Sequence, residues 1–225
     1  MILNIILVFI FLRKSIKIKK FSEITGQSIL IVERYAVIKN STPQTKGIKM
    51  QSRYKRLEQS PMWWYDKASD LHASAGVLWF SMDDKNRDTI RDQIGFSHGF
   101  DLRVACSSVC YMLWGLSFEL LFKSLLVVNK IKVPPPNTHN LCDLAEKGIF
   151  QLSKEEKEVL NILSLYIVWQ GKYPIPLKEK DFNGAKALGG LTLRKYNKAL
   201  SWNNLNNIWN RGSSQFFDGY NKLNT

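Results

Sequence analysis

Residues 111–130 read YMLWGLSFELLFKSLLVVNK, and this stretch decides the fold. Large apolar side chains occupy nearly every helical position, which is typical of a helix buried on all sides in a bundle. Gly115, Glu119 and Lys123 follow one another at four-residue steps, so they form one narrow polar stripe on that helix. An acid and a base are buried cheaply only when they pair with each other or meet a ligand. The stretch therefore predicts a central helix carrying either an ion pair or a ligand site.

Two segments after this helix have clear boundary signals. Residues 131–148, IKVPPPNTHNLCDLAEKG, turn at three consecutive prolines and place His139 at the start of a short helix over 138–147. Residues 151–174, QLSKEEKEVLNILSLYIVWQGKYP, begin with a capping box formed by Ser153 and Glu156. The resulting helix over 154–170 ends at Gly171, and Lys172-Tyr173-Pro174 follows it.

The rest of the chain adds further helices and no alternating strand pattern after residue 50. Ser60-Pro61 predicts a helix start, and apolar residues recur at three- and four-residue steps to about residue 82. The central helix is expected over 101–129 and a last helix over 194–210, with loops over 83–99 and 172–193. The fold class predicted is all-α: an antiparallel up-and-down helical bundle of four to five helices with a short accessory helix.

Three motifs in this order resemble the HEPN family of small helical nucleotide-binding domains. They are Glu119-Leu-Leu-Phe-Lys123, Thr138-His139-Asn140-Leu141 and Lys172-Tyr173-Pro174. The resemblance covers about residues 62–210 of an expected helical domain over 50–225. Two departures are present: lysine stands where the family usually has arginine before Tyr-Pro, and no histidine follows His139.

The resemblance implies a nucleotide- or RNA-binding or partner-docking module of the non-catalytic type that acts beside a nucleotidyltransferase. Such modules occur in prokaryotic toxin–antitoxin and anti-phage systems. The expected partners are a second copy of the chain in a homodimer, a nucleotidyltransferase or antitoxin chain, and a nucleotide or RNA. No cofactor is expected.

The expected nucleotide-binding residues are Glu119, Lys123, His139, Lys172 and Tyr173. Lys123 would neutralise a phosphate while Glu119 orients it, and Lys172 would add charge near the same end. Tyr173 offers a face for base stacking and His139 a hydrogen bond.

Each of these candidate binding residues also has a structural alternative. Glu119–Lys123 is also a standard helix-stabilising pair, His139 can cap the short helix, and Tyr173-Pro174 can close the bundle. The tryptophans at helical spacing, Trp63-Trp64 included, are first interpreted as core or interface anchors.

An enzymatic alternative rests on Arg91 and His98. Many HEPN relatives are metal-independent ribonucleases with an Arg-x4–6-His motif, and Arg91-Asp92-x5-His98 has that spacing. In such enzymes the arginine holds the phosphate and the histidine transfers a proton. This pair lies between the first two predicted long helices, whereas the family motif lies near the last one. The alternative is therefore a divergent ribonuclease using Arg91 and His98.

The amino-acid composition limits the predicted domain organisation and compartment, but it does not identify a ligand. A chain of 225 residues with 45% apolar content fits one domain with extensions. The net charge of +13 includes +7 from residues 1–49, which leaves a modest +6 for the rest. Three cysteines form no disulfide framework, and Cys106 and Cys110 are expected in the core, with no metal site. The redox state implied is reducing, hence cytoplasmic.

The first 49 residues are treated apart from the domain. MILNIILVFIFL is too short to span a membrane, and its basic flank RKSIKIKK comes after the apolar run and not before it. Three readings stay open: an unstructured leader, a membrane-associated anchor, and a translation start at Met50. A membrane-tethered interaction protein is expected only if residues 1–20 are expressed.

Overall fold

The computed structural model describes residues 52–134, 138–176, 178–187 and 199–223. Residues 51–225 form one compact unit, and the following description concerns that unit alone. The predictions for residues 1–49, including the membrane-associated leader, lie outside the described residues.

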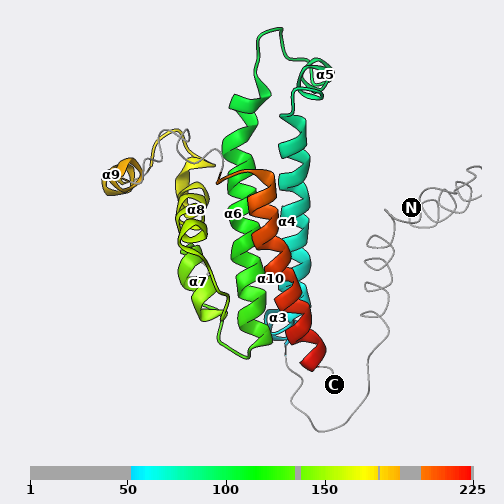
Figure 1. The fold of residues 1–225 in the computed structure, drawn as a ribbon, viewed down its shortest axis with the longest axis vertical. Coiled ribbons are helices and arrows are strands. Elements are labelled where there is room, and N and C mark those ends of the chain that lie inside the picture. The colour runs from blue at the N-terminus through cyan, green and yellow to red at the C-terminus, as the bar shows by residue number, and fades with distance from the viewer. Residues whose placement is uncertain (1–51, 135–137, 177, 188–198, 224–225) are drawn as a thin grey trace, which may run out of the picture. The chain divides into compact units, whose positions relative to one another are not determined.

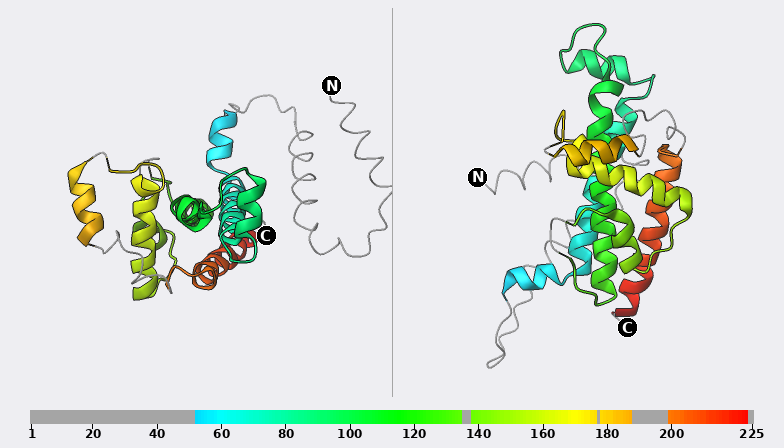
Figure 2. Two further views of the ribbon diagram at one scale, coloured as in Figure 1. Left: turned by 90° about the horizontal axis from the view of Figure 1, so that it is seen from above. Right: turned by 90° about the vertical axis from the view of Figure 1, so that its left-hand side faces the viewer.

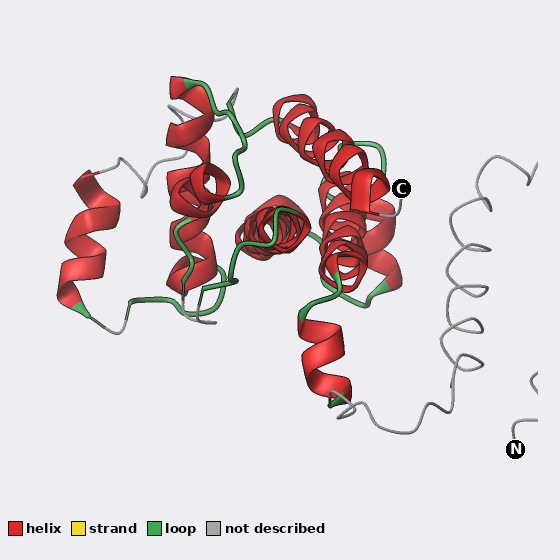
Figure 3. Ribbon diagram, turned by 90° about the horizontal axis from the view of Figure 1, so that it is seen from below, coloured by secondary structure: helices red, strands yellow, loops and turns green. Residues whose placement is uncertain are grey.

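Every regular element in the described part of the chain is a helix, which confirms the predicted all-α class (Figures 1 and 3). The long helices are α4 (Pro61–Ser81), α6 (Leu102–Val128), α8 (Lys154–Leu165) and α10 (Trp202–Leu223), and α8 continues into a π-helix, η1 (Tyr166–Gln170). The shorter ones are α3 (Arg53–Glu58), α5 (Arg87–Gln93), α7 (Leu141–Lys147) and α9 (Glu179–Ala187).

The long helices alternate in direction along the chain, and α6 lies at the centre. In Figure 1, α4 rises from α3 to α5, α6 descends, α7 and α8 lead back up, and α10 descends to the C-terminus. The end-on view in Figure 2 places α4, α8 and α10 around α6. This is the predicted antiparallel up-and-down arrangement, although the connections from α4 to α6 and from η1 to α10 are long and contain α5 and α9.

The central position of α6 explains its composition. Fourteen of its 27 residues are buried, among them Trp114, Phe118 and Phe122. By length and composition alone this helix could cross a membrane, with a mean hydropathy of 1.5 over its most apolar window, but 67% of that window is buried inside the bundle. Burial against three neighbouring helices accounts for an apolar surface on all sides.

Glycines let two helices approach α6 closely. A Cβ on Gly115 would lie 2.7 Å from Ile167 Cγ1 and 3.0 Å from the backbone oxygen of Leu163, so η1 and α8 pack directly on the α6 backbone. On α10, Gly212 sits against Leu121, and Gly219, seven residues later, against Val128. The Gly115 position on the predicted polar stripe therefore serves packing.

The element boundaries differ from the predictions in several places, and α3 is an additional helix that the sequence pattern did not predict. The predicted loop over 83–99 contains α5, a short helix whose Arg91 pairs with Asp88 at i,i+3. The predicted loop over 172–193 contains α9. Helix α7 begins at Leu141, three residues later than expected. Helix α10 begins at Trp202, later than the predicted start at residue 194, and residues 188–198 lie outside the described residues. It runs to Leu223, beyond the predicted end at residue 210, because Gly212, which reads as a breaker, is buried in a helix contact.

Candidate functional site

A buried charged cluster lies in the C-terminal half of α6. Lys123 Nζ donates to Glu119 Oε1 at 2.6 Å, and Glu119 Oε2 lies 2.8 Å from His139 Nδ1. The side chains of Lys123 and Glu119 are 4% and 5% exposed, whereas that of His139 is 30% exposed. The Lys123 ammonium also lies over the Trp64 ring, 6.0 Å from its centroid. Each oxygen of the Glu119 carboxylate therefore has one partner, Lys123 or His139, and both partners can carry a positive charge.

The connection between α6 and α7 places His139 against Glu119. It leaves α6 through Lys130, whose φ is 58°, with the Ile131 amide donating to the Leu126 carbonyl at 2.8 Å. It then enters α7, where the Asn140 side chain accepts from the Asp143 amide. The reading of His139 as the helix cap is wrong, because Asn140 caps α7. His139 is free of that role and its ring turns to the buried carboxylate.

The pair Glu119 and Lys123 lines the inner end of a pocket of about 860 Å³ between α3, α4, α6 and the α6–α7 connection. Its walls are mostly apolar and aromatic: Tyr54, Leu57, Trp63, Trp64, Leu120, Val133 and Pro134. Trp64 Nε1 donates to the Glu58 carbonyl at 2.9 Å, which ties α4 to the end of α3. Trp63 is 40% exposed, so its ring is accessible at the pocket. Apolar walls with a few polar groups are typical of a small-molecule site.

The charges at this pocket differ in their burial. Lys67, Lys132 and Glu58 are exposed at the outer part, while Lys123 and Glu119 are buried. Lys67 lies 3.8 Å from Asp70, a surface pair that holds it weakly. Within the described part of the chain, Glu119 is the acceptor for Lys123, so two of its three N–H donors are available. The outer lysines and the inner ammonium together favour an anionic ligand.

Lys172 and Tyr173 do not join this cluster. Both are exposed beyond η1, beside a separate pocket of about 480 Å³ that also includes Ser108, near the start of α6. Gly171 is packed on Met112, and from Met112 to Lys123 the axis of α6 advances about 16 Å at the standard helical rise. The structure therefore unites Glu119, Lys123 and His139, and separates them from Lys172 and Tyr173.

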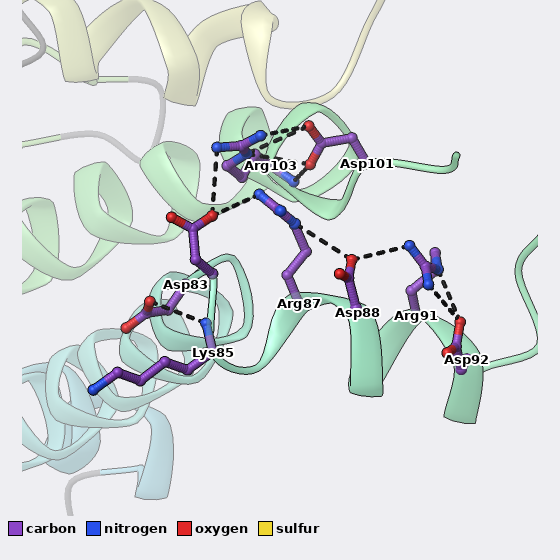
Figure 4. Close-up of polar contacts among 9 residues, drawn as sticks. Asp83, Lys85, Arg87, Asp88, Arg91, Asp92, Asp101 and Arg103 are labelled. Atoms are coloured by element: carbon purple, nitrogen blue, oxygen red, sulfur yellow. Dashed lines mark hydrogen bonds and ion pairs between the residues drawn. The ribbon is translucent and has the colours of Figure 1, made fainter. Parts of the chain in front are cut away.

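Arg91, one of the two residues of the ribonuclease alternative, is buried and already paired with two carboxylates. Arg91 is 6% exposed and its guanidinium is held by Asp88 at 2.9 Å and Asp92 at 2.8 Å (Figure 4). The network continues through Asp88 to Arg87. His98 is exposed on the turn between α5 and α6. Two carboxylates already satisfy this arginine, which leaves little positive charge for a substrate phosphate.

The sequence reading missed the pocket residues on α3, α4 and the α6–α7 connection. A usable signal was present in the adjacent Trp63 and Trp64. Neighbouring residues on a helix point about 100° apart, so two consecutive tryptophans do not both face one core. Lys132 and Pro134 gave no signal, because only the fold brings them to the same place as α3.

Two titratable groups away from this cluster, the partly buried His72 and the buried Cys110, pack in the bundle. His72 stacks on Trp209 with ring centroids 4.3 Å apart, and burial lowers the pKa of His72 to about 4. The Cys110 thiol donates to the Ala75 carbonyl, and burial raises its pKa to about 12. Cys110 is therefore a neutral core residue, as expected. In the described ranges, no group of three or more His, Cys, Asp or Glu is placed to hold a metal ion.

Comparisons with known proteins give no relative for this chain. No family model, no curated protein and no solved structure matches it. Within the fold, Glu119 of the first sequence motif contacts His139 of the second, and the third motif lies apart from both.

Proposed function

We propose that this chain is a HEPN-like helical module that binds a nucleotide in the pocket above Glu119 and Lys123, without chemistry of its own. The observation that carries the proposal is the combination of accessible aromatic walls with a buried, hydrogen-bonded ammonium at the inner end. A nucleotide has the matching parts, a planar base and an anionic phosphate. The same site also supports a partner-docking role, in which a partner chain presents the ligand.

The binding mode follows from the placement of the side chains. A base stacks on the accessible Trp63 ring, because every base has a π-face and stacking on an aromatic side chain is worth about 1–3 kcal/mol. The phosphate lies toward Lys132 and Lys67 and receives the remaining donors of Lys123. Glu119 holds Lys123 in position from behind. Lys172 and Tyr173 take no part in this mode, because they lie near the other end of α6.

The proposed cellular role rests on the resemblance to HEPN domains alone. That likeness favours a cytoplasmic homodimer working with a nucleotidyltransferase or an antitoxin chain in a toxin–antitoxin or anti-phage system. The ribonuclease alternative is less well supported, since Asp88 and Asp92 already hold the Arg91 guanidinium.

Isothermal titration with the full chain tests the proposal. The probes are the four nucleoside 5′-monophosphates, with uridine and ribose 5-phosphate as partial ligands. We expect the monophosphates to bind more tightly than either partial ligand. Trp63→Ala should weaken binding about tenfold or more through lost stacking, and Lys132→Ala by a smaller factor.

Two matched variants serve as controls. Tyr173→Ala removes another exposed aromatic ring and Lys154→Ala another exposed lysine, both away from the pocket. Neither should change the affinity by more than twofold or so. The proposal would be overturned if Tyr173→Ala and Trp63→Ala lowered the affinity equally, or if no monophosphate bound.

A further inference from the structure

Glu119 connects the pocket to a histidine that reaches solvent. One carboxylate oxygen accepts from Lys123, which lines the pocket, and the other contacts His139, which does not. The carboxylate is 5% exposed, whereas the imidazole is 30% exposed. A change of charge on the pocket side of Glu119 therefore changes the electrostatic potential at the His139 imidazole, which can exchange protons with water.

The contact with an ionised carboxylate sets which ring nitrogen of His139 faces Glu119 as a donor. A carboxylate only accepts, so Nδ1 of His139 carries the proton that faces Glu119. The other nitrogen, Nε2, is then the atom that gains a proton when the ring becomes positive. Charged groups reach this junction from three helices. Helix α6 supplies Glu119 and Lys123, and the first turn of α7 supplies the exposed Asp143. Helix α8 supplies the exposed Lys157 beside Cys142 and the uncharged Ser164, which accepts from the Leu141 amide.

We propose that binding of an anion in the pocket is coupled to protonation of His139 through Glu119; this rests on the proposed function. With a neutral imidazole, the buried charges of Glu119 and Lys123 cancel. A bound phosphate competes with Glu119 for the Lys123 ammonium, and a buried carboxylate that shares its positive partner is costly in a low-dielectric site. A proton taken from solvent at Nε2 offsets it. As the phosphate draws Lys123 toward itself, Glu119 is also left with His139 as its stronger partner.

Proton uptake measured by calorimetry tests the coupling. Uridine 5′-monophosphate is titrated into the full chain at pH 7 in buffers of different ionisation enthalpy, and the slope gives the protons taken up. His139→Asn keeps an amide N–H at the Nδ1 position but does not titrate. The ligand phosphate contributes equally to both proteins, so the difference isolates His139. His98→Asn, on the exposed turn, is the matched control.

We expect the wild type and His98→Asn to take up more protons than His139→Asn, by a fraction up to one per ligand. The affinity of the wild type should fall three- to tenfold more than that of His139→Asn between pH 6 and pH 8. Equal uptake in all three proteins, with binding retained, overturns the coupling and leaves the proposed function intact. Absence of binding overturns both.

A measurement on the wild type alone covers the case in which His139→Asn does not fold. At fixed pH 7, saturating uridine 5′-monophosphate should move the imidazole resonances of His139 toward the protonated position. Resonances of His139 that do not move while the ligand is bound contradict the coupling.

Discussion

Ion pairs of similar geometry but very different burial lie on α5, which precedes the N-terminal end of α6, and in the C-terminal half of α6 itself. Near the N-terminal end, Arg87, Asp88, Arg91 and Asp92 form an ion-pair network in which the carboxylates are 60–66% exposed (Figure 4). Toward the C-terminal end, Glu119 and Lys123 are about 95% buried and face a pocket. Water screens the carboxylates of the first group, although Arg91 itself is buried, and it does not reach either partner of the second. The difference shows that burial, more than the number of charged contacts, marks a candidate ligand site.

Removing one partner of the buried pair should have the largest effect. Glu119→Ala leaves Lys123 with an uncompensated charge and His139 without its acceptor. We expect a loss of about 3–5 kcal/mol in the free energy of unfolding, measured by urea denaturation. The double variant Glu119→Leu/Lys123→Met should recover most of this stability while losing nucleotide binding. A loss below about 1 kcal/mol in Glu119→Ala would show that the pair is hydrated and the comparison is wrong.

A substitution at the close contact between η1 and α6 should have the next largest effect on the free energy of unfolding. Gly115→Ala places a Cβ 2.7 Å from Ile167 Cγ1 and 3.0 Å from the Leu163 oxygen, and the backbone oxygen does not move aside as a side chain does. We expect a loss of about 1–3 kcal/mol, measured as a lower urea midpoint with an unchanged slope. Ala105→Gly, at an exposed position of the same helix, is the control for helix propensity and should cost less.

His72 should make stability depend on pH although it has no charged partner comparable to Glu119. Because burial lowers the folded-state pKa to about 4 from 6.5, the unfolded chain takes up a proton first as the pH falls. Stability is therefore present above pH 6.5 and is lost between pH 6.5 and pH 4. After allowance for solvent screening, the loss is on the order of 2 kcal/mol.

His72→Phe keeps a ring for Trp209 to stack on and removes the titration. The difference in unfolding free energy between the wild type and His72→Phe, followed from pH 7 to pH 4, isolates the histidine. A difference that does not change with pH would mean that the pKa of His72 is the same in the folded and the unfolded chain, and would contradict the effect of burial.

The exposed network should give the smallest effect. Asp88→Asn removes a carboxylate shared by Arg87 and Arg91 but leaves Asp92 on Arg91. We expect a change below about 1 kcal/mol, reduced further by added salt, in the same urea measurement. A loss as large as that of Glu119→Ala would erase the distinction between the two regions.

Much of the fold could be predicted from the sequence because burial and capping leave local patterns. The apolar run around Phe118 and Phe122 identified the central helix, and the capping box of Ser153 and Glu156 is present as expected. The polar α5 and the asparagine-rich α10 were placed less well, because ion pairing and tertiary burial outweigh weak local propensity there.

The candidate site could be predicted only in part. Glu119 and Lys123 were identified because a buried polar stripe on an apolar helix is unusual. Lys172 and Tyr173 were assigned to the wrong end of that helix. In an antiparallel bundle, α8 returns toward the start of α6, so residues after η1 lie near Ser108 and not near Lys123. The pocket walls on α3 and α4 depend on tertiary contacts alone.

Indole resonances test the central claim most directly, because tryptophans lie in both regions. Trp63 and Trp64 line the proposed pocket, and Trp169 lines the pocket beside Lys172 and Tyr173. In the full chain labelled with ¹⁵N-tryptophan, saturating uridine 5′-monophosphate should shift the indole N–H signals of Trp63 and Trp64 and leave that of Trp169 in place. Shifts confined to Trp169, or no shift at any tryptophan, would contradict a nucleotide site above Glu119 and Lys123.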